Sequence, residues 1–491
     1  MTFQTRISSA AETGHSDRSF DFDVAIIGAG TAGMAATREA ARHTGRIALI
    51  DGGPLGTTCA RVGCMPSKLL VAAAEAAHAG RISGVFGVHH GPATIDGRAV
   101  MQRVRSERDR FVGFVRETVH GFENTELIRE NARFEDDFTL RLESGRMITA
   151  RTTIIATGSS PVVPANLRAA GDRLIGNDDV FEWTDLPGSV AVVGTGVIGL
   201  ELGQALHRLG VRVRLFGRGH RAGPLTDPAV AGYASRSFTS EIPTSWDADI
   251  TASREGDQVV LRWGGGQEER FDYVISAAGR RPNLRFLGLE NTSLAPFDTP
   301  VPPYDPLSGR TKAPNIFIAG DANGDLPLLH EAADEGRLAG ENAARYPHAF
   351  RRARRTPLAI VFTDPQIALV GASHAQLAAD PKRAFTIGEV SFEDQGRARV
   401  MGVNRGLLRV YGERGTGRFL GAEMIAPAAE HLAHLLAWAI EAGLTVEQVL
   451  QMPFYHPVLE EGVRTAFLEL AAALETGANP AMRCLECADA E

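Results

Sequence analysis

Two cysteines stand close together in an early stretch of the sequence. Cys59 and Cys64 are separated by four residues, and the tripeptide Pro66-Ser67-Lys68 follows them. A thiolate is a nucleophile and a metal ligand, and two cysteines can also form a structural disulfide bond. The pair alone therefore admits redox chemistry, metal binding or a structural cross-link.

The small number of cysteines favours redox or metal chemistry over structural cross-linking. The chain has four cysteines among 491 residues, and its first twenty residues are polar, without the apolar segment of a signal peptide. Disulfide-stapled secreted folds are short and rich in cysteine, whereas paired cysteines in a reducing compartment are more often catalytic or metal-binding. We therefore expect a cytoplasmic protein in which residues 1–20 form a flexible extension.

The composition argues against nucleic acids and membranes as partners. Apolar residues make up 44% of the chain and charged residues 22%, as is typical of soluble globular proteins, and the length allows roughly two to four domains. The formal net charge of −8 is unsuited to neutralising phosphates. No run of about 18 apolar residues could span a bilayer.

Lysine is rare in this chain, and one of its few lysines lies beside the cysteines. Among 51 Lys and Arg residues, only Lys68, Lys312 and Lys382 are lysine. Lys68 therefore stands where arginine is the usual choice, which marks it as a candidate functional residue.

A dinucleotide-binding pattern precedes the cysteine pair. Residues 24–27 form an apolar run that predicts a buried strand, and a GxGxxG turn of Gly28, Gly30 and Gly33 leads from it into a helix. A second strand ends at Asp51, 23 residues (51 − 28) after the first glycine. The glycines let a pyrophosphate approach the helix N-terminus, and the acid binds ribose hydroxyls. This unit predicts a bound dinucleotide.

The same plan returns in residues 190–216. Gly194, Gly196 and Gly199 again connect an apolar strand to a helix, but the next strand ends without a carboxylate, and Arg218 and Arg221 follow it. An acid would bind the 2′-hydroxyl of NAD, whereas arginines suit the 2′-phosphate of NADP. We therefore predict NADPH rather than NADH, the alternative being a solvated basic loop.

Two strands that end in a glycine turn, at Gly158 and Gly279, extend the internal similarity. Two copies of one plan indicate two dinucleotides, one bound tightly and one exchanging. That arrangement is typical of a flavoprotein reduced by a nicotinamide, so we expect FAD at the first site and NADPH at the second.

Taken together, these motifs resemble those of the flavin-dependent pyridine nucleotide-disulfide oxidoreductases, which include lipoamide dehydrogenase, glutathione reductase and mercuric reductase. The resemblance runs from about residue 22 to residue 466. Besides the cysteine pair and the two glycine turns, it includes residues 277–283, 318–321, 361–368 and 456–461. It implies an α/β fold with two Rossmann-like dinucleotide-binding domains, for FAD and NAD(P), and an α+β C-terminal dimerisation domain.

The resemblance also implies an order of domains. After the N-terminal extension we expect an FAD-binding domain in two parts, with the NAD(P)-binding domain between them, then an interface domain and a tail. Their expected bounds are 21–160 and 283–355 for the FAD-binding domain, 161–282 for the NAD(P)-binding domain, 356–474 for the interface domain and 475–491 for the tail.

Catalytic roles are implied for six residues. Cys64 would exchange electrons with the flavin as a charge-transfer thiolate, and Cys59 would attack the substrate disulfide. The acid–base catalyst would be a histidine that the partner subunit of a homodimer supplies. A histidine suits this role because imidazole titrates near neutrality and a carboxylate can fix its tautomer. The remaining catalytic residues are His456 with Glu461 as this acid–base pair, and Lys68 with Glu201 as an ion pair beside the flavin.

Further residues are implied to bind the cofactors, with Asp321 holding the ribityl chain of the flavin. No resident metal is expected. The expected cofactor-binding residues are Gly28, Gly30, Gly33, Asp51, Thr58, Lys68, Thr157, Gly158, Asp321, Leu329, Gly194, Gly196, Gly199, Arg218, Arg221 and Gly279.

The implied activity is electron transfer from NADPH through FAD and the cysteine pair to a small or protein-borne disulfide. Residues 328–336 resemble lipoamide dehydrogenase instead, so a dihydrolipoamide dehydrogenase of a 2-oxoacid or related lipoyl-protein system is an alternative. A reductase of mercuric or other soft-metal ions is another, although mercuric reductases generally lack a counterpart of His456. Cys484 and Cys487 in the tail could relay electrons, bind a soft metal or have no role.

Overall fold

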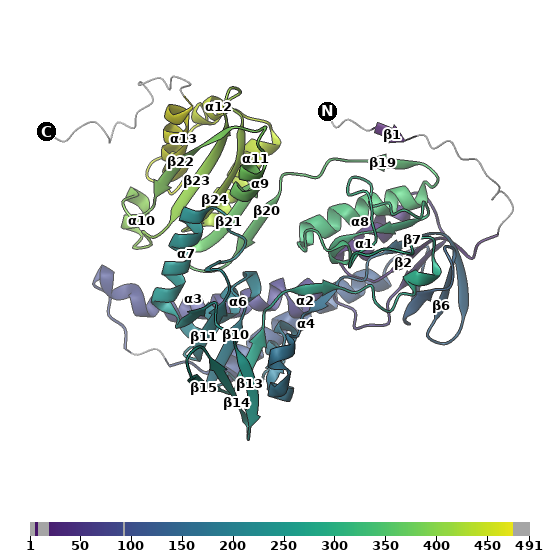
Figure 1. Ribbon diagram of the computed structural model, residues 1–491, viewed down its shortest axis with the longest axis horizontal. Helices are drawn as coiled ribbons and strands as arrows, with labels where there is room; N and C mark the ends of the chain where they lie inside the picture. The colour runs from purple at the N-terminus through teal and green to yellow at the C-terminus, as the bar shows by residue number, and fades with distance from the viewer. Residues whose placement is uncertain (1–4, 8–18, 92–93, 475–491) are drawn as a thin grey trace.

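The computed structural model describes residues 5–7, 19–91 and 94–474 (Figure 1). Three sheets with their helices make up most of this part of the chain. The candidate pair Cys484 and Cys487 lies outside the described residues.

The first sheet carries the N-terminal glycine turn. Its parallel strands run in the order β4-β3-β2-β7-β18, and β7 also begins an antiparallel edge, β7-β6-β5. Short apolar runs form the central parallel strands because both faces are buried. The strands are β2 (Phe22–Ile27), β3 (Ile47–Ile50), β4 (Thr125–Ile128), β5 (Ala132–Phe134), β6 (Thr139–Leu142), β7 (Met147–Ile155) and β18 (Ile316–Ile318).

Two helices far apart in the sequence, α1 (Thr31–Ala40) and α8 (Leu329–Ala344), lie side by side along this sheet (Figure 1). A Cβ atom on Gly336 would lie 2.2 Å from the carbonyl oxygen of Ala32, and one on Gly340 would lie 2.4 Å from that of Ala36. Glycine is therefore required where α8 crosses α1. This contact joins the two sequence segments that build the first nucleotide site.

The second sheet is parallel throughout, in the order β12-β11-β10-β16-β9. A small antiparallel sheet, β13-β14-β15, extends from it. The elements are β9 (Leu174–Ile175), β10 (Ser189–Val193), α6 (Val197–Arg208), β11 (Arg212–Gly217), α7 (Pro228–Glu241), β12 (Thr244–Trp246), β13 (Thr251–Glu255), β14 (Gln258–Trp263), β15 (Gln267–Phe271) and β16 (Tyr273–Ser276).

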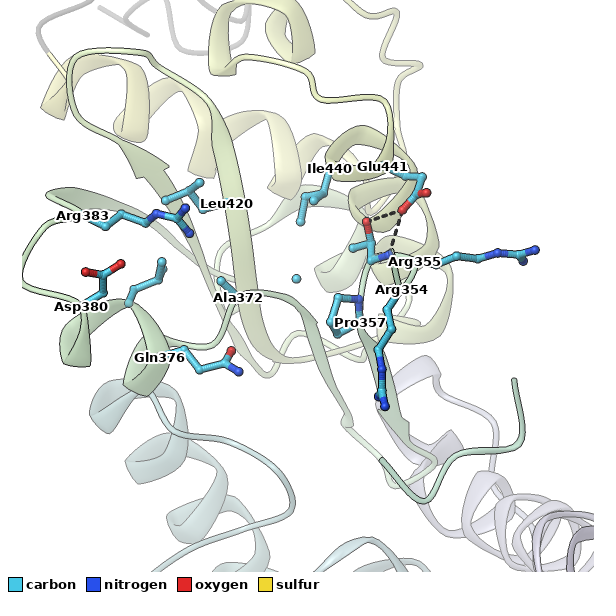
Figure 2. Close-up of a pocket in the computed structure, with 13 residues that line it drawn as sticks. Arg354, Arg355, Pro357, Ala372, Gln376, Asp380, Arg383, Leu420, Ile440 and Glu441 are labelled. Carbon is cyan, nitrogen blue, oxygen red and sulfur yellow. Dashed lines mark hydrogen bonds between the residues drawn. The ribbon is translucent and has the colours of Figure 1, made fainter. Parts of the chain in front are cut away.

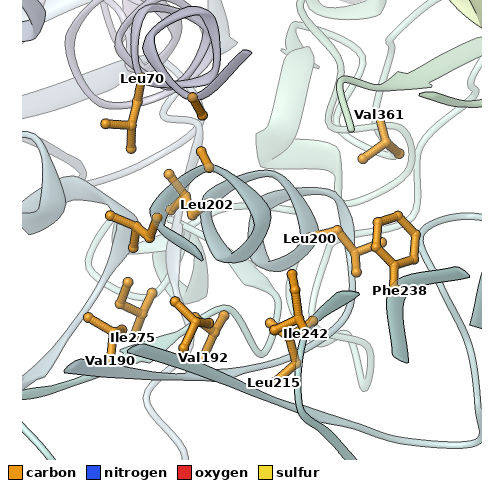
Figure 3. Close-up of a cluster of buried hydrophobic side chains, with 14 of the residues drawn as sticks. Leu70, Val190, Val192, Leu200, Leu202, Leu215, Phe238, Ile242, Ile275 and Val361 are labelled. Atoms are coloured by element: carbon orange, nitrogen blue, oxygen red, sulfur yellow. The ribbon is translucent and has the colours of Figure 1, made fainter. Parts of the chain in front are cut away.

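The core of this region lies around α6 (Figure 3). Leu200 and Leu202 of α6 are buried with Val192 and Leu215 of the sheet below and with Leu70 of α3 (Cys64–Ile82) above. The helix that follows the cysteines is thus fixed against the second sheet. This packing sets the distance between α3 and α6, which both carry candidate catalytic residues.

The remaining elements of this part of the chain connect the first two sheets. A two-stranded antiparallel pair, β8 and β17, joins the ends of the first and second sheets. The elements are α2 (Thr58–Val62), η1 (Ser83–Phe86), α4 (Gly97–His120), β8 (Ser159–Pro161), η2 (Ala165–Arg173), α5 (Asn177–Val180), β17 (Arg280–Pro282), η3 (Leu289–Asn291) and η4 (Gly320–Asn323).

The third sheet forms the C-terminal domain. It is antiparallel, in the order β20-β21-β24-β23-β22, and α11 and α13 pack against it. The elements are β20 (Leu358–Val361), β21 (Gln366–Gly371), α9 (His374–Ala379), β22 (Phe385–Ser391), α10 (Gly396–Val400), β23 (Leu407–Glu413), β24 (Phe419–Ala426), α11 (Ala429–Glu441), α12 (Val446–Leu450) and α13 (Glu461–Ala473).

The expected α/β architecture with two Rossmann-like units and an α+β C-terminal domain is confirmed. A strand that we did not expect, β1 (Thr5–Ile7), lies within the segment anticipated to be a flexible extension, and it pairs antiparallel with β19 (Ala349–Arg351). Across the described ranges, no helix is both long and apolar enough to cross a membrane.

Candidate active site

The two cysteines meet at the junction of two helices. Cys59 lies in the first turn of α2, and Cys64 is the first residue of α3. The side chain of Thr57 accepts a hydrogen bond from Ala60 N–H at 3.1 Å and so caps α2. A Cβ atom on Gly63 would lie 3.0 Å from the carbonyl oxygen of Thr58, so glycine permits the tight approach of the two helices.

Both cysteines are thiols in the structure, and their acidities differ. A hydrogen bond from the thiol of Cys59, followed by the nearby charge of Lys68, lowers the pKa of Cys64 to about 7. The same hydrogen bond, together with burial, raises the pKa of Cys59. The position of Cys64 at the N-terminus of a 19-residue helix also favours its anion. Cys64 is therefore the thiolate of the pair near neutral pH.

Lys68 and Glu201 form the expected ion pair. Lys68 Nζ lies 2.6 Å from Glu201 Oε2, although 133 residues separate them in the chain. Lys68 follows Cys64 by one helical turn and thus lies on the same face of α3. Glu201 is only 3% exposed, and its other oxygen accepts a hydrogen bond from Phe362 N–H at 2.9 Å. The Lys68 ammonium also lies 4.6 Å from the centre of the Phe362 ring.

His456 and Glu461 are also in contact, but at a different place in the molecule. His456 Nδ1 lies 3.0 Å from Glu461 Oε1, and Glu461 Oε2 accepts a hydrogen bond from Val458 N–H at 3.1 Å. Glu461 is the first residue of α13, which lies in the C-terminal domain away from α2 (Figure 1). Within one subunit, the acid–base pair is therefore remote from the cysteines.

The first glycine turn has the form that a dinucleotide requires. Gly28 has φ +109°, and a Cβ atom on Gly33 would lie 1.8 Å from the carbonyl oxygen of Gly28. Asp51 Oδ2 accepts a hydrogen bond from Ala29 N–H at 2.7 Å, which ties the acid to the turn. A cavity of about 930 Å³ opens here, lined by Gly28, Asp51 and Thr157 among others, and the hydroxyl of Thr157 is buried without a partner. These residues fit the adenosine end of FAD.

Other expected flavin contacts lie outside this cavity. Asp321 Oδ2 accepts a hydrogen bond from the Ser159 hydroxyl at 2.7 Å, and Ser159 in turn binds Arg280 Nε at 2.8 Å. Ser159 and Arg280 were not among the expected site residues, because β8 and β17 bring them together only in the folded chain. The remaining expected contacts, which also do not line this cavity, are Gly30, Gly33, Thr58, Lys68, Gly158 and Leu329.

The second glycine turn repeats this geometry. Gly194 has φ +119°, and a Cβ atom on Gly199 would lie 1.9 Å from the carbonyl oxygen of Gly194, whereas one on Gly196 would contact nothing within 4 Å. Gly279, on the neighbouring strand end, has φ +105° and is also open. The turn therefore leaves its backbone accessible at Gly196.

Arg218 and Arg221 follow β11 and are both exposed. The loop that carries them is tied to the glycine turn, since the Thr195 hydroxyl donates a hydrogen bond to the carbonyl oxygen of Arg221 at 2.6 Å. A carboxylate that the sequence analysis missed, Asp247, accepts a hydrogen bond from Gly219 N–H. It comes from the end of β12, whose pairing with β11 places the two strand ends at one edge of the sheet.

A further cavity, of about 530 Å³, lies in the C-terminal domain (Figure 2). Three arginines line it, but each is paired with a carboxylate: Arg354 with Glu335 at 2.7 Å, Arg355 with Asp334 at 3.3 Å, and Arg383 with Glu413 at 3.6 Å. These pairs account for the positive charge around the cavity, which lies outside the cysteine site.

Most of the chain matches the models of one known family. Residues 22–336 match the family model described as pyridine nucleotide-disulphide oxidoreductase, and residues 358–467 match the dimerisation domain of the same family. The chain belongs to the pyridine nucleotide-disulphide oxidoreductase family. It is therefore an enzyme of the flavoprotein disulfide oxidoreductase class, which depends on FAD and uses a pyridine nucleotide.

Individual members of the pyridine nucleotide-disulphide oxidoreductase family match nearly the whole chain. The dihydrolipoyl dehydrogenase of Geobacillus stearothermophilus is 30% identical over 453 residues, which cover 91% of this chain and 95% of that protein. The mercuric reductase of Shigella flexneri is 31% identical over 468 residues, which cover 90% of this chain and 80% of that protein.

Two solved structures have the same fold. LpdA of Mycobacterium tuberculosis superposes with a TM-score of 0.78 at 25% identity, covering 91% of this chain and 99% of that chain. RclA of Escherichia coli, a flavoprotein disulfide reductase solved as a Cu(II) complex, gives 0.77 at 23% identity, with 91% and 99% covered. The likeness to RclA concerns the fold alone.

Proposed function

We propose that this oxidoreductase uses NADPH to reduce a small or protein-borne disulfide, with Cys59 and Cys64 as its redox-active pair. The observation that carries the proposal is the inequality of the two thiols. Cys64 is the more acidic and lies next to the Lys68–Glu201 pair, whereas Cys59 holds its proton more tightly. Such an inequality suits one sulfur that faces the flavin and one that exchanges with substrate.

FAD would be held by the first glycine turn, Asp51 and Thr157 at its adenosine end and by Asp321 along its ribityl chain. When bound, FAD supplies the two-electron carrier between the nicotinamide and the cysteines. The chain's own contribution there is Lys68, whose charge is held by a buried carboxylate and an aromatic ring. A fixed cation at this place stabilises negative charge on neighbouring atoms.

The disulfide exchange follows from thiol chemistry. In the reduced enzyme, the sulfur of Cys59 attacks one sulfur of the substrate and the substrate S–S bond breaks. The first substrate thiolate takes up a proton and leaves as a thiol. Cys64 then attacks the sulfur of Cys59, which releases the second substrate thiol and leaves a Cys59–Cys64 disulfide. Two electrons and one proton from NADPH, with a second proton from solvent, restore the dithiol, so each turnover consumes one NADPH, one proton and one substrate disulfide.

In this proposal, His456 is the general acid–base catalyst of the exchange. A base must take the proton of the Cys59 thiol and return one to the leaving thiolate, and imidazole titrates in the right range. Because His456 and Glu461 are remote from the cysteines of their own subunit, we propose that His456 of the partner subunit of a homodimer serves each site. The match of residues 358–467 to a dimerisation domain supports this arrangement.

A dihydrolipoyl dehydrogenase is the second candidate. The observation that favours it is the similarity to dihydrolipoyl dehydrogenases along nearly the whole chain. The two candidates use the same residues and differ in nucleotide and in direction, because a lipoamide dehydrogenase in a 2-oxoacid complex runs toward NADH. Reduction of soft-metal ions is a third outcome of the same test, and truncation after Asn479 would show whether Cys484 and Cys487 take part.

The test is to follow oxidation of NADPH and NADH against lipoamide, glutathione disulfide, other low-molecular-weight disulfides, thioredoxin and Hg(II). We expect NADPH to be preferred and at least one disulfide to turn over. Replacing Arg218 and Arg221 together by alanine should raise the KM for NADPH roughly tenfold and leave that for NADH unchanged, because only NADPH carries the 2′-phosphate. Arg236→Ala, on the exposed side of α7, is the control. A clear preference for NADH, or turnover with Hg(II) alone, would contradict the proposal.

A further inference from the structure

One face of α6 contacts a single short segment of the C-terminal domain. Glu201, Gln204 and Arg208 are spaced three and four residues apart, so they share one face of the helix. All three bind residues 362–364, which connect β20 to β21. The helix that carries the candidate catalytic carboxylate is thus tied to another domain at three successive points.

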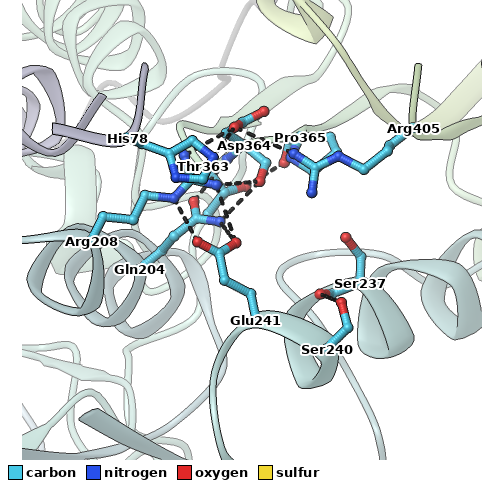
Figure 4. A network of polar contacts seen from close by, with 10 residues as sticks. All are labelled: His78, Gln204, Arg208, Ser237, Ser240, Glu241, Thr363, Asp364, Pro365 and Arg405. Carbon is cyan, nitrogen blue, oxygen red and sulfur yellow. Dashed lines mark hydrogen bonds and ion pairs between the residues drawn. The ribbon is translucent and has the colours of Figure 1, made fainter. Parts of the chain in front are cut away.

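The contacts at the far end of this face are dense (Figure 4). Asp364 N–H donates to Gln204 Oε1 at 2.8 Å, and Gln204 Nε2 donates back to the Asp364 carbonyl oxygen at 2.9 Å. Arg208 donates to Asp364 Oδ2 at 2.9 Å and to Glu241 Oε1 at 2.6 Å. The side chain of Arg208 is 3% exposed, so it is a buried cation shared between two carboxylates.

Two further side chains lie near the Asp364 carboxylate. His78 of α3 lies 4.0 Å from Asp364 Oδ2, and Arg405 of the C-terminal domain lies 3.5 Å from the same atom. Arg208 makes the shortest of these charged contacts with Asp364, at 2.9 Å, and Gln204 binds both the N–H and the carbonyl oxygen of Asp364. Asp364 and its neighbours are therefore held in one position chiefly by Arg208 and Gln204.

The same segment touches both members of the Lys68–Glu201 pair. Phe362 N–H donates to Glu201 Oε1, while the Phe362 ring faces the Lys68 ammonium. A single residue, Thr363, separates Phe362, whose backbone N–H binds Glu201, from Asp364, whose carboxylate binds Arg208. A displacement at Asp364 would therefore be passed directly to Phe362.

We propose that Arg208 and Gln204 are positioning residues: by fixing residues 362–364 they hold Phe362 against Glu201 and Lys68, and so keep the Lys68 charge beside Cys64. The inference rests on the proposed function, in which this ion pair acts next to the redox cysteines. It adds a contact from the C-terminal domain to the machinery of the cysteine site.

The test uses the FAD-loaded enzyme reduced with dithiothreitol. Alkylation of Cys64 by iodoacetamide is measured against pH, with Cys59 and Cys64 resolved by mass spectrometry. In Arg208→Gln we expect Phe362 to lose its contacts with Glu201 and Lys68, and the Lys68 side chain to turn toward solvent. The thiolate of Cys64 would then no longer have a cation beside it. Alkylation of Cys64 at pH 6.5 should then slow by about threefold or more, since a rise of half a unit in pKa has that effect on the thiolate population.

The matched control is Arg409→Gln. Arg409 also joins the C-terminal domain to the region of the second sheet, because it lies 3.2 Å from the buried carboxylate of Asp227. It does not contact residues 362–364. Asp364→Asn is a milder second variant, which keeps the shape of the side chain and removes the charge that binds Arg208. Arg208→Lys should retain part of the wild-type alkylation rate of Cys64, because it keeps a cation at the same place.

Two outcomes separate the inference from the function on which it rests. In a Lys68→Met background, Arg208→Gln should add no further change if it acts through Lys68. Equal slowing in Arg208→Gln and Arg409→Gln, or an unchanged profile in Arg208→Gln and Asp364→Asn, would overturn the positioning role. An unchanged profile in Lys68→Met itself would instead overturn the role proposed for the ion pair.

Discussion

At the scale of single residues, the cysteine pair derives its asymmetry from its surroundings. Cys59 and Cys64 have the same chemistry, but one donates a hydrogen bond to the other, and Lys68 lies one turn along the helix that begins at Cys64. Each of these influences favours the anion of Cys64. Lys68 is a lysine in a chain that otherwise uses mostly arginine because its compact ammonium fits between the Glu201 carboxylate and the Phe362 ring.

The hydrogen bond from Cys59 is the largest influence that lowers the pKa of Cys64. Cys59→Ala should therefore raise that pKa toward the value of an ordinary thiol and slow alkylation of Cys64 below pH 8. Cys59→Ser retains a hydroxyl donor and should leave the profile near that of the reduced wild-type enzyme. The measurement is the pH dependence of iodoacetamide labelling at Cys64, and equal profiles for the two variants would refute the role of the hydrogen bond.

At the scale of elements, the two strand–turn–helix units show which glycines serve the fold and which serve the ligand. In the second unit, a side chain at Gly199 would collide with the backbone of Gly194, while one at Gly196 would meet open space. The first position is needed for the helix to pack closely after the strand. The second leaves room for a pyrophosphate at the helix N-terminus.

Gly199→Ala and Gly196→Ala should therefore fail in different ways. Overpacking at Gly199 should destabilise the protein by about 1–3 kcal/mol and lower the melting temperature by several degrees. Gly196→Ala should melt like the wild type but show a KM for the nicotinamide nucleotide raised about tenfold or more. Thermal unfolding and steady-state kinetics check both, and a stable Gly199→Ala protein with normal kinetics would contradict the packing argument.

At the scale of the whole molecule, the C-terminal domain presents an apolar surface that suits a second subunit. Trp438 and Leu435 of α11 are 66% and 43% exposed, and Met452 and Tyr455 are 48% and 80% exposed. With neighbouring residues they surround a cavity of about 470 Å³. Tyr455, one of the residues that line it, directly precedes His456 in the chain. Large exposed aromatic and aliphatic side chains of this kind are typical of interfaces.

We expect Trp438→Glu to convert the proposed dimer to a monomer, as measured by light scattering. If His456 serves the other subunit, disulfide reduction should then fall by about 10²–10⁴, which is the usual contribution of a general acid–base catalyst. NADPH-dependent reduction of an artificial electron acceptor should persist, because it does not need the histidine. Met147→Glu, at an exposed apolar site on β7, should change neither property. A monomeric variant with full disulfide turnover would place the acid–base group elsewhere.

The sequence by itself determined the local units of this protein. The glycine turns, the strands and helices that flank them and the acid at the end of the second strand are encoded by neighbouring residues, because strand, turn and helix depend on short-range sterics and periodicity. The family resemblance then named the partners of Lys68 and His456, and the structure places Glu201 at 2.6 Å and Glu461 at 3.0 Å from them.

Only the tertiary structure decided how separate elements meet. Asp247 reaches the Arg218 loop because β12 pairs with β11, and Phe362 reaches Lys68 because the C-terminal domain packs on α6. The tertiary structure also puts α13, which begins at Glu461, at a distance from α2, which is why the proposed acid–base catalyst comes from the partner subunit. Contacts of this kind depend on the packing of whole faces, which no local pattern in the sequence specifies.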